Sequence, residues 1–186
     1  MSTHIDYEIN KELGECYLFM GDFDKARTYY EKAAAAAPEQ SDVYLGLATV
    51  DVQKGDLESA AANYAKAGEL KVSDKPLAGL GLIEMETGKH ENAFDHFKQA
   101  LAINPVNMVA INGLVQEGYF LNRLEDIIPY LRAAVAEDDA EPVRYTLAGC
   151  LTALGRDDEA KAELEILLGA NPDNQSAREL YARVAA

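Results

Sequence analysis

Tryptophan is absent from this sequence, and cysteine and histidine are scarce. Cys16 and Cys150 fall in the first and last parts of the chain, too far apart to favour an intramolecular disulfide. Two lone thiols fit a reducing compartment. Of the three histidines, His90 and His96 are spaced so that they lie on different faces of a helix, which excludes a helical metal pair. The sequence therefore predicts neither a metal nor a cofactor.

Basic residues are also few. The chain has 17 Lys and Arg against 32 Asp and Glu, a formal net charge of −15. The acidic excess is spread along the chain, because residues 1–107 and 108–186 hold 18 and 14 acidic side chains. Binding of nucleic-acid phosphates requires a basic face, so this function class is excluded. The excess fits solubility best, with an acidic docking surface for a basic partner as the alternative.

Long apolar runs are missing as well. The stretch of five alanines at 33–37 is far shorter than the ~20 residues of a membrane span. The first ten residues have neither the basic region nor the apolar region of a secretory signal. These absences predict a cytoplasmic protein without direct membrane insertion. The 48% hydrophobic and 26% charged residues are typical of a folded chain.

A regular period is the main positive feature. Gly21, Gly55, Gly88, Asn122 and Gly155 recur at a nearly constant interval in the low thirties. A leucine and, in four of five cases, a small residue precede each of them, at Leu13-Gly14, Leu47-Ala48, Leu80-Gly81, Leu114-Val115 and Leu147-Ala148. A period of this length indicates an array of repeated supersecondary units.

Each period predicts two helices. The first helix ends at the glycine or asparagine, and the second begins with acidic residues, which suit a helix amino terminus. Pro38, Pro105 and Pro172 end the second helix in three units. One domain over 1–186 is predicted, with units at 7–40, 41–73, 74–107, 108–140 and 141–174, and with a helix at 175–186 that caps the array through Ala177, Leu180, Tyr181 and Val184.

The second helix of each unit repeats a pattern of packing residues. Small residues flank a ring in Ala26-Tyr30-Ala33, Ala60-Tyr64-Ala67 and Ala93-Phe97-Ala100, and the later units have Ile127-Leu131-Ala134 and Ala160-Leu164-Leu167. Spacings of four and three residues place these side chains on one helix face. The pattern predicts a core. Pro129 predicts a kink or a late start in the fourth unit's second helix.

Together, the leucine–small pairs, the turn glycines, the alanine–aromatic–alanine pattern and the terminal prolines resemble the tetratricopeptide repeat over residues 7–174. Unit 108–140 fits the pattern least well. The resemblance implies an all-α, right-handed superhelical solenoid of five repeats, with the first helix of each repeat on the concave side. The groove residues it implies are Lys11, Phe19, Leu45, Thr49, Lys75, Leu82, Met85, Asn112, Gln116, Tyr119, Phe120 and Tyr145.

Three further glycines, Gly46, Gly79 and Gly113, fall at matching places in successive first helices. Each costs about 0.5–1 kcal/mol relative to alanine in a helix. Two explanations stay open, namely close helix–helix contact within the array or approach of a ligand to the backbone.

The function predicted from these features is a non-enzymatic scaffold that binds a peptide or helical segment of a protein partner in its largely apolar groove. Two alternatives remain. One is a structural element that self-associates into a homo-oligomer through an uncapped amino-terminal repeat. The other is the repeat segment of a larger enzyme, such as a transferase.

Overall fold

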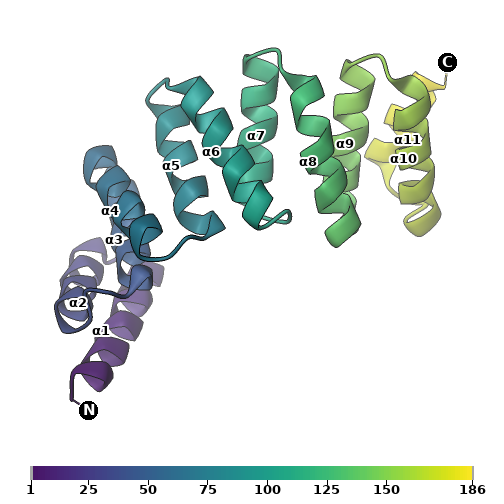
Figure 1. The fold of residues 1–186 in the computed structure, drawn as a ribbon. Helices are drawn as coiled ribbons and strands as arrows, with labels where there is room; N and C mark the ends of the chain where they lie inside the picture. Colours follow the sequence, from purple (N-terminus) through teal and green to yellow (C-terminus); the bar gives the residue numbers. More distant parts are fainter. Residues whose placement is uncertain (1, 186) are drawn as a thin grey trace. The chain divides into compact units, whose positions relative to one another are not determined.

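The computed structural model describes residues 2–185, and every regular element in that range is an α-helix (Figure 1). The predicted all-α fold is therefore confirmed. Met1 and Ala186, which the predicted domain includes, lie outside the described residues. The chain divides into two compact units, residues 1–96 and 97–186.

The helices follow the predicted alternation of first and second helices. Each hairpin pairs an odd-numbered helix with the even-numbered helix that follows, and α11 stands alone at the end. The bounds are α1 (Ser2–Phe19), α2 (Phe23–Ala36), α3 (Ser41–Lys54), α4 (Leu57–Leu70), α5 (Asp74–Glu86), α6 (His90–Ile103), α7 (Met108–Phe120), α8 (Leu124–Glu137), α9 (Glu141–Ala153), α10 (Asp157–Ala170) and α11 (Gln175–Val184).

The turn inside each hairpin has the same backbone geometry. Gly21, Gly55, Gly88 and Gly155 have φ angles of 77°, 77°, 75° and 70°, and Asn122 reaches 55° in the fourth hairpin. In each turn the next N–H donates to the carbonyl five residues earlier, as Asp56 does to Asp51 over 2.9 Å. These are the left-handed residue and the closing bond of a helix C-terminal motif. Asparagine is the residue besides glycine that adopts this conformation readily.

The second helices begin in two different ways. Asp22 and Asp56 cap α2 and α4, because their carboxylates accept from the backbone N–H groups of Lys25 and Ser59 at 3.2 and 3.1 Å. Hydrogen bonding to Lys25 and Ser59 holds the pKa of each carboxyl below its usual value. By contrast, α8 and α10 begin after arginines that form no side-chain cap.

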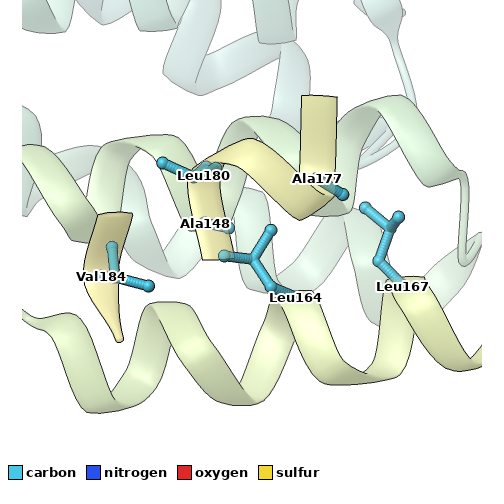
Figure 2. Close-up of a cluster of buried hydrophobic side chains, with 6 residues drawn as sticks. All are labelled: Ala148, Leu164, Leu167, Ala177, Leu180 and Val184. Atoms are coloured by element: carbon cyan, nitrogen blue, oxygen red, sulfur yellow. The ribbon is translucent and has the colours of Figure 1, made fainter. Parts of the chain in front are cut away.

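The last helix packs against the hairpin before it. Ala177, Leu180 and Val184 of α11 are buried with Leu164 and Leu167 of α10 and Ala148 of α9. Figure 2 shows the two leucines of α10 directed toward α11. The opposite face of α11 carries exposed Arg178, Glu179 and Arg183. This helix therefore covers apolar surface of α9 and α10 and carries charged residues on its other face.

Two details of the helices differ from the sequence interpretation. The helix α8 begins at Leu124 and runs through Pro129, so a late start is wrong. Pro129 lies in the second turn, and its ring occupies an exposed position. The helix α1 begins at Ser2, ahead of the predicted unit at 7–40. The additional turn precedes Tyr7, which is buried in a cluster with Ala33 and Val43.

Candidate functional site

Rings from the second helices lie against the glycines of the following first helices. A Cβ atom added to Gly46 would lie 2.4 Å from Cε1 of Tyr30, and one on Gly79 would lie 2.5 Å from Cε1 of Tyr64. On Gly113 it would lie 2.3 Å from Cζ of Phe97. Any side chain at these positions would overlap a ring of the preceding second helix. Close packing within the array therefore accounts for all three glycines.

An apolar cleft opens beside one of these contacts, within residues 1–96. It has a volume of about 460 Å³ and lies among α3, α4 and α5. Leu82 and Met85, both predicted as groove residues, line it together. The complete lining is Val52, Gly55, Leu57, Tyr64, Gly79, Leu82, Ile83, Met85 and Glu86. Glu86, which is exposed, is the charged member of this set.

Tyr64 and its neighbours give the cleft its shape. Burial raises the pKa of the Tyr64 phenol, and a hydrogen bond with Thr49 opposes this shift. The Thr49 hydroxyl also donates to the carbonyl of Leu45 over 2.9 Å. The Thr49 hydroxyl is therefore bonded within its own helix. Because glycine stands at position 79, the Tyr64 ring can approach α5 closely, and both residues line the cleft.

A buried ionic contact joins two of the cleft helices, α3 and α4, to α2. Asp51 is fully buried in α3, beside the cleft residue Val52. Its carboxylate pairs with Arg27 of α2 and accepts from the side-chain amide of Asn63 in α4 over 2.8 Å. Three helices are thus joined through one carboxylate. A buried charge that lost its partner would be costly, so these helices hold a defined spacing.

The other predicted groove residues of the first unit are more scattered. Lys11 pairs with Glu8 at 3.4 Å and lies 5.8 Å from the centre of the Tyr7 ring. Phe19 and Lys75 are exposed, and Leu45 is half-buried. None of these four residues lines the cleft.

The second unit carries the remaining predicted residues on α7 and α9. Asn112, Gln116, Tyr119 and Phe120 are exposed on α7. Tyr145 is half-buried and packs against the cluster in Figure 2. Burial raises the pKa of Tyr119 and of the Cys150 thiol, and the two side chains share a hydrogen bond.

Part of the cleft lining lies beyond the sequence prediction. The repeat pattern predicts Tyr64 as a core residue alone, and it does not predict Leu57, Ile83 or Glu86 as site residues. The recurrence of a ring in one repeat and a glycine in the next first helix, as in Tyr64 and Gly79, is a usable signal, since such a pair predicts close contact.

Metal-ligating residue types are dispersed in the described part of the chain. No group of three or more His, Cys, Asp or Glu side chains within residues 2–185 could hold a metal ion. His96 instead lies with Nδ1 2.5 Å from a carboxylate oxygen of Glu84. No helix in the described range is both long enough and apolar enough for a membrane span.

Comparison with known protein families decides the classification. Models of the tetratricopeptide repeat match residues 7–71, 75–107 and 121–184, which together make up most of the chain. The chain belongs to the tetratricopeptide repeat family. The cleft is therefore framed by a first helix, a second helix and the first helix of the next tetratricopeptide repeat.

Similar tetratricopeptide segments occur in larger proteins. The BBSome complex member BBS4 of Bos taurus is 34% identical over 108 residues, which cover 57% of this chain and 20% of that protein. Anaphase-promoting complex subunit 3 of Schizosaccharomyces pombe is 25% identical over 177 residues, which cover 92% of this chain and 26% of that protein. The chain thus spans about a quarter or less of these relatives.

Solved tetratricopeptide structures share the fold. PilF of Pseudomonas aeruginosa superposes with a TM-score of 0.75 at 18% identity, covering 100% of this chain and 85% of that one. YrrB, a TPR protein with an unusual peptide-binding site, has a TM-score of 0.64 at 16% identity, with 91% and 89% coverage. These identities support the fold and carry no residue-level function.

Proposed function

We propose that this chain is a protein-interaction module whose cleft among α3, α4 and α5 receives an apolar side chain from a segment of a protein partner. The cleft itself is the observation that carries the proposal. Val52, Leu57, Leu82, Met85 and the Tyr64 ring line it. Apolar clefts with a few polar groups are typical binding sites, and a methionine in the wall adapts to the shape of its occupant.

Charge narrows the chemistry of the partner. Glu86 is exposed at the cleft, and the chain as a whole carries a net charge of −15. A partner segment with Lys or Arg beside its apolar anchor would meet an opposite charge there, which favours encounter and fixes orientation. The proposed ligand is therefore an apolar residue flanked by a basic one.

The relatives support interaction rather than catalysis. BBS4 is named as a complex member and the fission-yeast relative as a complex subunit, so tetratricopeptide segments like this one occur in assemblies. The cleft lining has one carboxylate and one phenol among aliphatic side chains. It offers no pair of acid and base and no activated nucleophile. We assign binding, and not catalysis, to this site.

Partner recovery with cleft variants tests the proposal. The tagged wild-type chain, Leu82→Glu and Val72→Glu would be compared in quantitative affinity purification from the source organism. Leu82 lines the cleft, whereas Val72 is an exposed aliphatic residue outside it in the same unit. A carboxylate in the apolar cleft should lower recovery of a specific partner about tenfold or more. Val72→Glu should recover it normally.

Helical content must be equal in all three proteins, as judged by circular dichroism. Equal recovery by wild type and Leu82→Glu would reject the cleft as the binding site. Equal losses with Leu82→Glu and Val72→Glu would point to general surface charge and would also reject it.

A further inference from the structure

The first helix carries an exposed apolar stripe that the proposed function does not use. Ile5, Ile9, Phe19 and Met20 of α1 and its turn are 57, 52, 95 and 73% exposed, and Cys16 between them is exposed as well. Their spacings place all five on one face of the helix. A face of this kind on a folded protein marks an interaction site.

Alignment of α1 with α3 shows what the equivalent face of another first helix contacts. When the leucines of the repeat pattern are aligned, Ile9 and Cys16 correspond to Val43 and Val50 of α3, which are both 0% exposed. There, Val43 and Val50 pack in clusters with buried side chains of the preceding α2. The stripe on α1 is therefore the face that an inner first helix uses to receive another helix.

Glu12 determines which helix can bind there. In the same alignment it corresponds to Gly46, at the place where α3 needs glycine to admit the ring of Tyr30. A second helix with a central ring, like α2, would clash with the glutamate side chain. Glu12 is exposed, and no ion pair engages it within the described residues 2–185.

A second copy of the chain is a poor occupant for electrostatic reasons. Glu12 lies midway along the stripe, between Ile5 and Phe19. Two copies related by a twofold axis would pair their α1 helices antiparallel and bring the two Glu12 carboxylates together. Like charges facing each other across an interface are strongly unfavourable.

We infer that the stripe on α1 docks an amphipathic helix of a partner protein, with apolar residues against Ile5, Ile9 and Phe19 and a lysine or arginine opposite Glu12. This surface is independent of the cleft. It would let the chain hold two segments at once, one in the cleft and one on α1.

Matched synthetic peptides test the inference. The probes are two fluorescein-labelled amphipathic helices of about five turns with the same leucine stripe, one with a central lysine and one with a central glutamate. Fluorescence anisotropy should show the wild type binding the lysine peptide on the order of fivefold to tenfold more tightly. Glu12→Lys should reverse this preference, and Ile9→Ser should weaken both peptides.

The native thiols give a second measurement. Cys16 is exposed within the stripe and Cys150 is buried, so an alkylating reagent should label Cys16 first. The bound lysine peptide should slow this labelling in the wild type. Leu82→Glu should leave both readouts unchanged, which separates this surface from the cleft.

Three outcomes would overturn the inference. They are no saturable binding of the lysine peptide, an unchanged preference in Glu12→Lys, and a concentration-dependent dimer of the wild type that Ile9→Ser abolishes. The last result would make a second copy the occupant.

Discussion

The junctions after Tyr30, Tyr64 and Phe97 differ from the junction after Leu131. At the first three junctions, the ring occupies the space that a Cβ atom of the next first helix would need, and the residue at that position is glycine. This glycine directly precedes the leucine of the repeat pattern. At the fourth junction the residue directly before that leucine is Thr146. The side chain of Leu131 is smaller than an aromatic ring, so we expect it to leave space for the Thr146 side chain. The glycines therefore follow from the size of the residue they meet.

The contrast also bears on the cleft. The pair of Tyr64 and Gly79 lines the cleft, and the ring lies where a Cβ at position 79 would be. Glycine is thus expected wherever a first helix meets an aromatic ring of the preceding second helix, and substitutions at these positions test this relation.

The largest effect is expected from Gly113→Ala. Its Cβ would lie 2.3 Å from Cζ of Phe97, which is fully buried. Forced repacking of this kind costs about 1–3 kcal/mol and outweighs the better helix propensity of alanine. Urea unfolding followed by circular dichroism should show this loss. A variant as stable as the wild type would mean that the Phe97 ring moves aside freely.

An aromatic ring introduced at position 131 should create the same need for glycine at position 146. Leu131 is fully buried, so Leu131→Phe should destabilise by about 1–2 kcal/mol through overpacking. Adding Thr146→Gly should recover part of that loss, although glycine alone weakens the helix. A double-mutant cycle measures the coupling between the two sites. Purely additive effects would show that Leu131 and Thr146 do not face each other as Phe97 and Gly113 do.

Substitution of a glycine that contacts no ring should raise stability instead of lowering it. A Cβ on Gly149 would meet nothing within 4 Å, and this glycine lies inside α9. Gly149→Ala should therefore raise stability by about 0.5–1 kcal/mol, since it removes the cost of glycine in a helix. The thermal midpoint is the measurement, and the variant doubles as the control for Gly113→Ala. A lower midpoint would contradict the open space around Gly149.

The smallest effect concerns the capping of α4. The pKa of Asp56 is lowered by hydrogen bonding to Ser59, so its contribution to stability is present above the unfolded pKa and is lost as pH falls through the folded one. Asp56→Asn keeps a cap acceptor but removes this titration. Stability measured from pH 5 to pH 2 should fall less in this variant than in the wild type.

The control for that series is Glu58→Gln, which removes an exposed carboxylate in the same turn that is not the cap residue. If Glu58→Gln reduced the loss of stability between pH 5 and pH 2 as much as Asp56→Asn, net charge rather than capping would explain the effect.

Much of the fold could be predicted from the sequence because its signals are local. The period of the turn residues predicts the hairpins, and Asn122 is recognisable because it substitutes for glycine at positive φ. The alternation of small and large residues likewise predicts the cores of the second helices. These patterns depend on neighbours within one or two helical turns, which a single sequence reveals.

The site is harder to predict because it depends on how successive repeats stack. Leu82 and Met85 follow from helical spacing, but Tyr64 comes from a different helix and borders the cleft through its contact with Gly79. Asp51 escapes prediction because a carboxylate is normally exposed, and its burial depends on arginine and asparagine side chains from two other helices. Such contacts join residues 12 and 24 positions apart.

Selection of peptides on the intact chain tests the central claim about the cleft most directly. A displayed library of short random peptides would be selected on the wild type, and the recovered peptides would be measured against Leu82→Glu and Val72→Glu. We predict peptides that share a bulky apolar residue next to Lys or Arg and that lose binding with Leu82→Glu alone. Recovered peptides that bind Leu82→Glu as tightly as the wild type would contradict the assignment of the cleft.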